Sequence, residues 1–125
     1  MSVRLFCAAV FVVAAPAAQA CGYCVEDKVA ATYDHAVVSR AIARGEVVVF
    51  AEVSGGANAA SLTRKARRAA AQLKEVDRTS IRVAETPATL SFAMRSRTRS
   101  PAEALAAAER AAAGGVKLTL LTVMR

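Results

Sequence analysis

The stretch "EVVVFAEVSGGANAASL", residues 46–62, decides the fold, because its periodicity changes from that of a strand to that of a helix. Residues 46–53 are short and rich in valine, which is typical of a β-strand. Two glycines follow, and then Asn58 and Ser61, either of which can cap the start of a helix. Apolar residues recur at helical spacing to about Glu75, so the stretch predicts a strand, a glycine turn and a helix.

The same alternation of strand and helix continues to the C-terminus. Two segments of alternating polarity, 81–83 and 90–94, flank a turn at Pro87 and predict a second and a third strand. The sequence "SPAE", residues 100–103, predicts a helix that begins with a capping box and a proline in its first position. A glycine pair ends that helix, and the apolar residues 116–124 predict the closing strand.

Residues 46–125 therefore predict an α+β fold with the order strand, helix, strand, strand, helix, strand. This is the ferredoxin-like βαββαβ arrangement, in which an antiparallel sheet carries both helices on one face. Ahead of it, apolar residues at helical spacing predict an additional N-terminal helix over 25–44. Gly45 follows its last turn, where a left-handed residue is commonly needed.

The first strand is apolar on both of its sides, with Val47 and Val49 on one face and Val48 and Phe50 on the other. A sheet face that is open to water alternates polar with apolar residues. The sequence therefore predicts that something covers the second face of the sheet. The candidates are the helix over 25–44 and a second subunit of a homodimer.

Residues 46–125 resemble the heavy-metal-associated domain of copper chaperones and metal-pumping ATPases. The resemblance rests on "EVVVFAEVSGGANAASL", "EVDRTSIRVAETPATLSF" and "SPAEALAAAERAAAGG". That family binds soft metals through a Cys-x-x-Cys pair in the loop before its first helix. The matching positions here are Asn58 and Ser61, and because Cu(I) needs soft sulfur ligands, the resemblance implies the scaffold without its usual metal site. We expect Asn58 to cap the helix instead.

The N-terminus predicts export. A basic residue, an apolar run over 5–15 and a small-residue motif ending at Ala20 indicate a signal peptide over 1–20, and hence a periplasmic protein. Cleavage removes Cys7 and makes Cys21 the first residue of the mature chain. Attachment of lipid to Cys21 stays open as an alternative that would add membrane association.

Two cysteines in the sequence "CGYC", Cys21 and Cys24, are the candidate functional residues. As thiolates they suit a soft metal, with copper as the first expectation and zinc as a second. As a redox couple they would benefit from the dipole of the helix that follows, which is expected to lower the pKa of the thiols. As a structural disulfide they would close a very short loop and stabilise the fold by only about 2 kcal/mol. The sequence favours metal binding or trafficking, with a non-catalytic adaptor module or a small thiol-disulfide protein as alternatives.

The remaining polar residues do not predict an enzyme. His35, the single histidine, lies 11 residues after Cys24, which is about 16 Å along a continuous helix and too far for a shared metal ion. We expect His35 to be a surface or helix-packing residue.

The chain is basic, with a formal net charge of +7. For an exported protein this favours anionic lipid or lipopolysaccharide over nucleic acid, so no nucleic acid partner is expected. The arginines of "RKARR", residues 64–68, and "RSRTR", residues 95–99, are predicted to lie on a solvated face and a solvated loop. A metal-transport or other periplasmic protein remains the expected partner.

Overall fold

The computed structural model describes residues 24–125, so the predicted signal peptide and Cys21 lie outside the described residues. Four α-helices, one short 3-10 helix and four strands follow one another along this part of the chain. In chain order they are α1 (Val25–Thr32), α2 (His35–Ala43), β1 (Val47–Gly55), α3 (Ala59–Ala71), η1 (Arg78–Ser80), β2 (Arg82–Glu85), β3 (Ala88–Met94), α4 (Pro101–Ala112) and β4 (Val116–Met124).

The four strands form one antiparallel sheet in the order β2-β3-β1-β4, which confirms the predicted α+β class. Strand β1 is central, and its residue Val48 pairs with Ala93 of β3 on one side and Met124 of β4 on the other. The register of β1 against β4 shifts between Phe50 and Ala51, where the pairing is irregular. The four-residue strand β2 forms one edge of the sheet and β4 forms the other.

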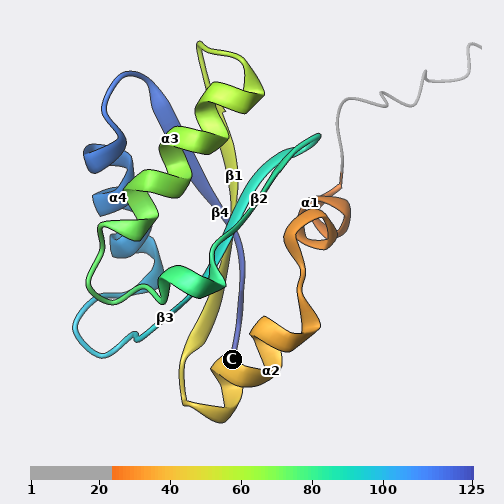
Figure 1. Cartoon of the computed structure of the whole chain (residues 1–125), viewed down its shortest axis with the longest axis vertical. Helices are drawn as coiled ribbons and strands as arrows, with labels where there is room; N and C mark the ends of the chain where they lie inside the picture. The colour runs from red at the N-terminus through yellow and green to blue at the C-terminus, as the bar shows by residue number, and fades with distance from the viewer. Residues whose placement is uncertain (1–23) are drawn as a thin grey trace, which may run out of the picture.

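Helices α3 and α4 cover one face of the sheet, as predicted (Figure 1). Their alanine-rich inner sides allow a close approach to the β1 and β3 side chains that point toward them. Ala66 of α3 and Ala108 of α4 are fully buried against Val49 and Phe92 in the larger of the two cores. Small residues on the helices and large ones on the sheet fill this layer, so the packing depends on size complementarity.

Helices α1 and α2 cover the second face of the sheet, on the side opposite α3 and α4 (Figure 1). Val38 and Ala41 of α2 pack against Val48 and Phe50 of β1 in a second, smaller core, and Val29 of α1 borders it. The prediction that the N-terminal helix covers this face is therefore confirmed.

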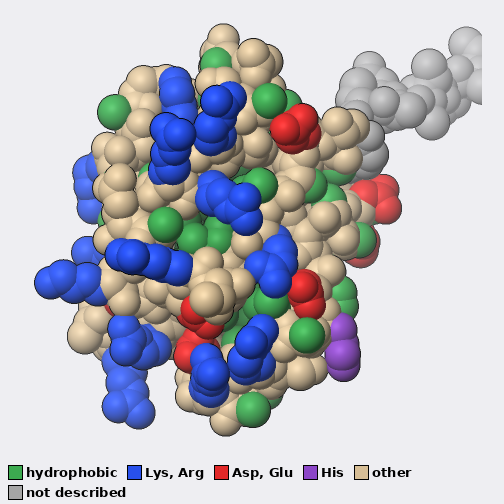
Figure 2. All heavy atoms as spheres, viewed as in Figure 1, with side chains coloured by type: hydrophobic (Ala, Val, Ile, Leu, Met, Phe, Trp, Pro, Cys, Tyr) green, Lys and Arg blue, Asp and Glu red, His purple; other side chains and the backbone are tan. Residues whose placement is uncertain are grey.

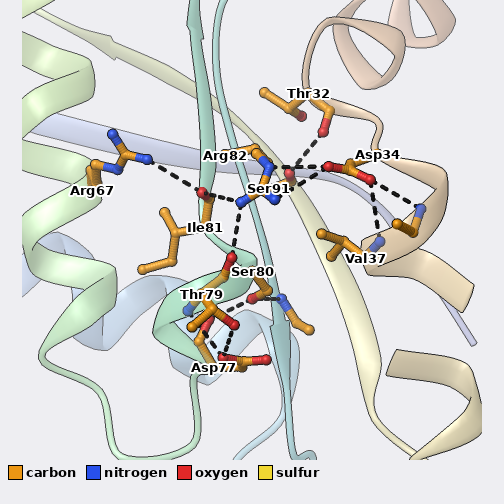
Figure 3. A network of polar contacts seen from close by, with 12 residues as sticks. Thr32, Asp34, Val37, Arg67, Asp77, Thr79, Ser80, Ile81, Arg82 and Ser91 are labelled. Atoms are coloured by element: carbon orange, nitrogen blue, oxygen red, sulfur yellow. Dashed lines mark hydrogen bonds and ion pairs between the residues drawn. The ribbon is translucent and has the colours of Figure 1, made fainter. Parts of the chain in front are cut away.

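The prediction of one continuous helix over 25–44 is wrong, because the helix breaks at Tyr33 and Asp34. The side chain of Asp34 caps α2 by accepting hydrogen bonds from the backbone N–H groups of Ala36, at 3.0 Å, and Val37, at 3.3 Å. The same carboxylate forms an ion pair of 3.2 Å with Arg82 of β2 (Figure 3). The Val37 N–H and then Arg82 hold the pKa of Asp34 below its ordinary value.

A second polar contact fixes the end of α1 on the sheet. The buried hydroxyl of Ser91 in β3 donates to the carbonyl oxygen of Thr32, the last residue of α1 (Figure 3). The ion pair of Lys28 with Glu52, 2.9 Å long, joins the middle of α1 to β1. The break thus lets two short helices follow the twisted sheet, where one straight helix would leave it.

The local start and stop signals behave largely as predicted. Gly45 has a φ of +71° after α2, Asn58 accepts a hydrogen bond of 2.9 Å from the Ser61 N–H at the start of α3, and Ser100 caps α4. Helix α3, however, ends at Ala71 and does not reach residue 75. The chain leaves the helix early because Val76 forms a β-bridge with the last residue of β3.

Candidate functional site

Cys24 is the one predicted site residue that lies within the described residues. It occupies the N-cap position of α1 with an extended backbone, and its side chain is exposed. Its carbonyl oxygen accepts the first helical hydrogen bond, from the Lys28 N–H at 3.0 Å, but its thiol caps no backbone N–H. The sulfur therefore points to solvent from a helix whose position on the sheet is fixed.

The surroundings of Cys24 raise the pKa of its thiol, so the predicted lowering of the pKa is wrong. The nearby backbone N–H of Asp27 favours the thiolate, as expected at the start of a helix. The side chains of Asp27 and Glu26, in the same first turn, and partial loss of hydration outweigh it. A neutral thiol is a weaker nucleophile than a thiolate, so these surroundings do not activate Cys24.

His35 is exposed at the start of α2, and the structure does not join it to Cys24. Its ring contacts the Tyr33 hydroxyl at 3.4 Å and the Ser39 hydroxyl at 3.3 Å. Among residues 24–125 no three His, Cys, Asp or Glu side chains lie close enough together to hold a metal ion. A site with three such ligands that includes Cys24 would therefore take at least one of them from outside this range.

A shallow apolar groove lies beside the first turn of α1. It has a volume of about 460 Å³ and is lined by α1, Tyr33 and Thr122 of β4. Two of its side chains, Val25 and Tyr33, are 48% and 45% exposed. The sequence pattern did not reveal this groove, since it forms only where the broken helix crosses β4.

A larger hollow, about 660 Å³, lies where the α2–β1 turn meets the loop between β3 and α4. Its lining holds four cationic side chains, Arg44, Lys74, Arg95 and Arg97, and two carboxylates, Glu46 and Glu75. The Arg95 guanidinium is held by the carbonyl oxygen of Lys74 at 2.8 Å. In the sequence Arg44 and Lys74 stand far from the 95–99 cluster, and only the tertiary fold brings these residues together.

No protein-family model, curated protein or solved structure matches this chain. No helix within residues 24–125 is long and apolar enough to cross a membrane.

Proposed function

We propose that this protein is an exported, non-enzymatic carrier that captures a soft metal ion through Cys21 and Cys24, with Cu(I) as the expected cargo and Zn(II) as a second candidate. The observation that carries the proposal is the exposed Cys24 thiol at the start of α1, three positions after Cys21 in the sequence. Two thiolates at this spacing can bind one soft cation. A further ligand would come from a partner protein or from a second copy.

The surroundings of the Cys24 thiol support capture of a metal ion over a structural disulfide or a redox couple. A structural disulfide would restrain a segment that begins at an exposed residue, so it would brace no part of either core. A redox couple requires a stabilised thiolate, whereas the pKa of Cys24 is raised. The carboxylates of Glu26 and Asp27 that disfavour the thiolate favour an arriving cation.

We propose further that residues 46–125 have the ferredoxin-like βαββαβ fold of the heavy-metal-associated domain. The element order β1-α3-β2-β3-α4-β4 and the central position of β1 support this assignment. In the loop where the heavy-metal-associated family carries its Cys-x-x-Cys pair, this chain has a helix cap instead, because Asn58 accepts a hydrogen bond from the Ser61 N–H. The N-terminal cysteines would then supply the ligands that this loop lacks.

The test is a competition titration of the reduced, processed protein with Cu(I) and a chromophoric Cu(I) chelator. We expect one Cu(I) per protein, or one per two proteins if a second copy completes the site. Binding should weaken by about a hundredfold for each unit that pH falls between 8 and 6, because two thiols must release their protons. A Zn(II) titration under the same conditions compares the two metals.

Replacement of both cysteines by serine should abolish Cu(I) binding, since Cys21 and Cys24 are the only cysteines left after loss of residues 1–20. The matched control is His35→Ala, which removes the single histidine from an exposed position and should leave the affinity unchanged. The proposal is wrong if the reduced protein binds neither metal stoichiometrically, or if the double serine variant binds as well as the wild type.

A further inference from the structure

The charges of the protein are separated along the chain and in space. Residues 24–60 contain three Lys or Arg and five Asp or Glu, whereas residues 61–99 contain ten Lys or Arg and three Asp or Glu. The second segment forms α3, η1, β2 and the loop after β3. Figure 2 shows Lys and Arg side chains spread over one face of the molecule, with few acidic side chains among them. We call this surface the basic face.

Most cations of the basic face are not neutralised. Within residues 24–125 only two of the ten form ion pairs, Arg82 with Asp34 and Arg99 with Glu75. Structural Lys and Arg residues on a protein surface are commonly paired or interspersed with acids. The remaining eight therefore create a positive potential that extends into solvent.

Several of these unpaired cations are held in place. Arg67 and Arg78 donate hydrogen bonds to the carbonyl oxygens of Ile81, at 3.5 Å, and Ala71, at 2.9 Å. Arg95 is held by a carbonyl oxygen in the same way, at the hollow described above. A carbonyl orients a guanidinium without cancelling its charge, so less side-chain freedom is lost when an anion binds.

The composition of the basic face identifies the kind of anion. Within residues 24–125 the aromatic side chains are Tyr33, which lies beyond α1, and the buried Phe50 and Phe92. The basic face thus lacks the aromatic platforms on which single-stranded nucleic acid stacks. The basic face also lacks exposed large apolar side chains that would insert into a bilayer. The four exposed large apolar side chains within residues 24–125 all lie outside residues 61–99: Val25, Tyr33, Ile42 and Leu120. A broad layer of fixed cations fits a layer of anionic headgroups.

We propose that the basic face docks the exported protein onto an anionic lipid surface. Phosphate headgroups lie against the cations of α3, η1 and the loop after β3, and not in the hollow described above, whose lining also holds Glu46 and Glu75. The attraction is electrostatic, so it is reversible and weakens as salt is added. This docking does not depend on the cysteines.

The test is cosedimentation with vesicles, after mass spectrometry has shown that Cys21 is unmodified. We expect binding to vesicles of phosphatidylcholine with 30% phosphatidylglycerol in 50 mM salt, release in 500 mM salt, and no binding to pure phosphatidylcholine. The variant Arg64→Gln/Arg68→Gln removes two exposed cations from α3 and should weaken binding about thirtyfold. Glutamine keeps a good helix propensity, and circular dichroism checks the fold.

The matched control is Lys117→Gln/Arg125→Gln, which removes the same charge from exposed positions outside the basic face and should change binding by less than threefold. Equal losses in both variants would show that net charge alone drives adsorption, and would overturn the proposal. Binding to neutral vesicles, or tighter binding to a 20-bp DNA duplex in the same buffer, would overturn it as well. The double serine variant of Cys21 and Cys24 should bind vesicles normally, which separates this test from that of metal capture.

Discussion

Two adjacent glycines at the end of β1, Gly55 in the strand and Gly56 just after it, should respond to alanine in opposite ways. Gly55 has a φ of +156° and pairs with Val116 of β4. A Cβ at Gly55 would overlap the carbonyl oxygen of Gly115 and lie only 2.8 Å from Leu62 Cδ2. The Leu62 side chain can move aside, but the Gly115 oxygen belongs to the backbone that enters β4. A Cβ at Gly56 would meet nothing within 4 Å.

The structure sets the size of this difference. Gly55→Ala combines an overpacking cost of about 1–3 kcal/mol with a backbone strain of about 1–3 kcal/mol, so we expect a loss of about 2–6 kcal/mol. A domain of this size is stable by about 5–15 kcal/mol, so the variant should be severely destabilised or unfolded. Gly56→Ala restricts mainly the unfolded chain and should stabilise the protein by up to about 1 kcal/mol.

Urea unfolding followed by circular dichroism measures both variants. With an m-value of about 1–3 kcal/mol/M, Gly55→Ala should lower the midpoint by about 1 M or more, and Gly56→Ala should leave it unchanged or raise it. Equal midpoints for the two variants would refute the reasoning, because they would show that the end of β1 approaches neither β4 nor α3 closely.

Three further predictions test the N-terminal layer. Val38→Ala, in the core between α2 and the sheet, should lower the free energy of unfolding in urea by about 2 kcal/mol. Val25→Ala, at a site 48% exposed, should lower it by less than about 0.5 kcal/mol. Similar losses for the two variants would contradict the packing of α2 on the sheet. The pKa of Asp34 is lower in the folded state, so the stabilisation of the fold by its carboxylate is complete above about pH 5 and is lost as pH falls through the folded pKa. The melting temperature should therefore fall less with decreasing pH in Asp34→Asn than in the wild type. With Cys21 replaced by serine, Cys24 should react with iodoacetamide at pH 7.5 more slowly than an unstructured cysteine peptide, and a faster reaction would mean that its pKa is not raised.

The strands and caps were predictable because their signals are local. The valine-rich run that became β1, Asn58 before α3 and Ser100 before α4 each act on residues within a few positions in the chain. Coverage of the second sheet face was also predictable, since Val48 and Phe50 alternate with residues that already belong to the first core. In each case the sequence carried the cause within a short window.

The helix break and the charge of the thiol site were not predictable in this way. Asp34 interrupts a helical repeat of apolar residues because it is held by Arg82, 48 positions later in the chain. The pKa of Cys24 depends on two opposing effects: the backbone at the helix start lowers it, and the side chains of Asp27 and Glu26 raise it. The sequence displayed the helix start and the two acids, but only geometry determines which effect is larger.

The separation of charge also constrains how the protein sits at a membrane. The basic face is the side turned to the viewer in Figure 2, and in the same view α1 and α2 lie to one side of the sheet (Figure 1), so docking through the basic face would place Cys24, at the start of α1, at the flank of the docked protein. Lipid attached to Cys21 would instead hold α1 against the headgroups, because the three residues from Cys21 to Cys24 span at most about 10 Å. The two kinds of attachment would therefore orient the protein differently. On the proposals made above, docking through the basic face with an unmodified Cys21 would leave the thiol open to a soluble partner, whereas lipid on Cys21 would hold it at the headgroups.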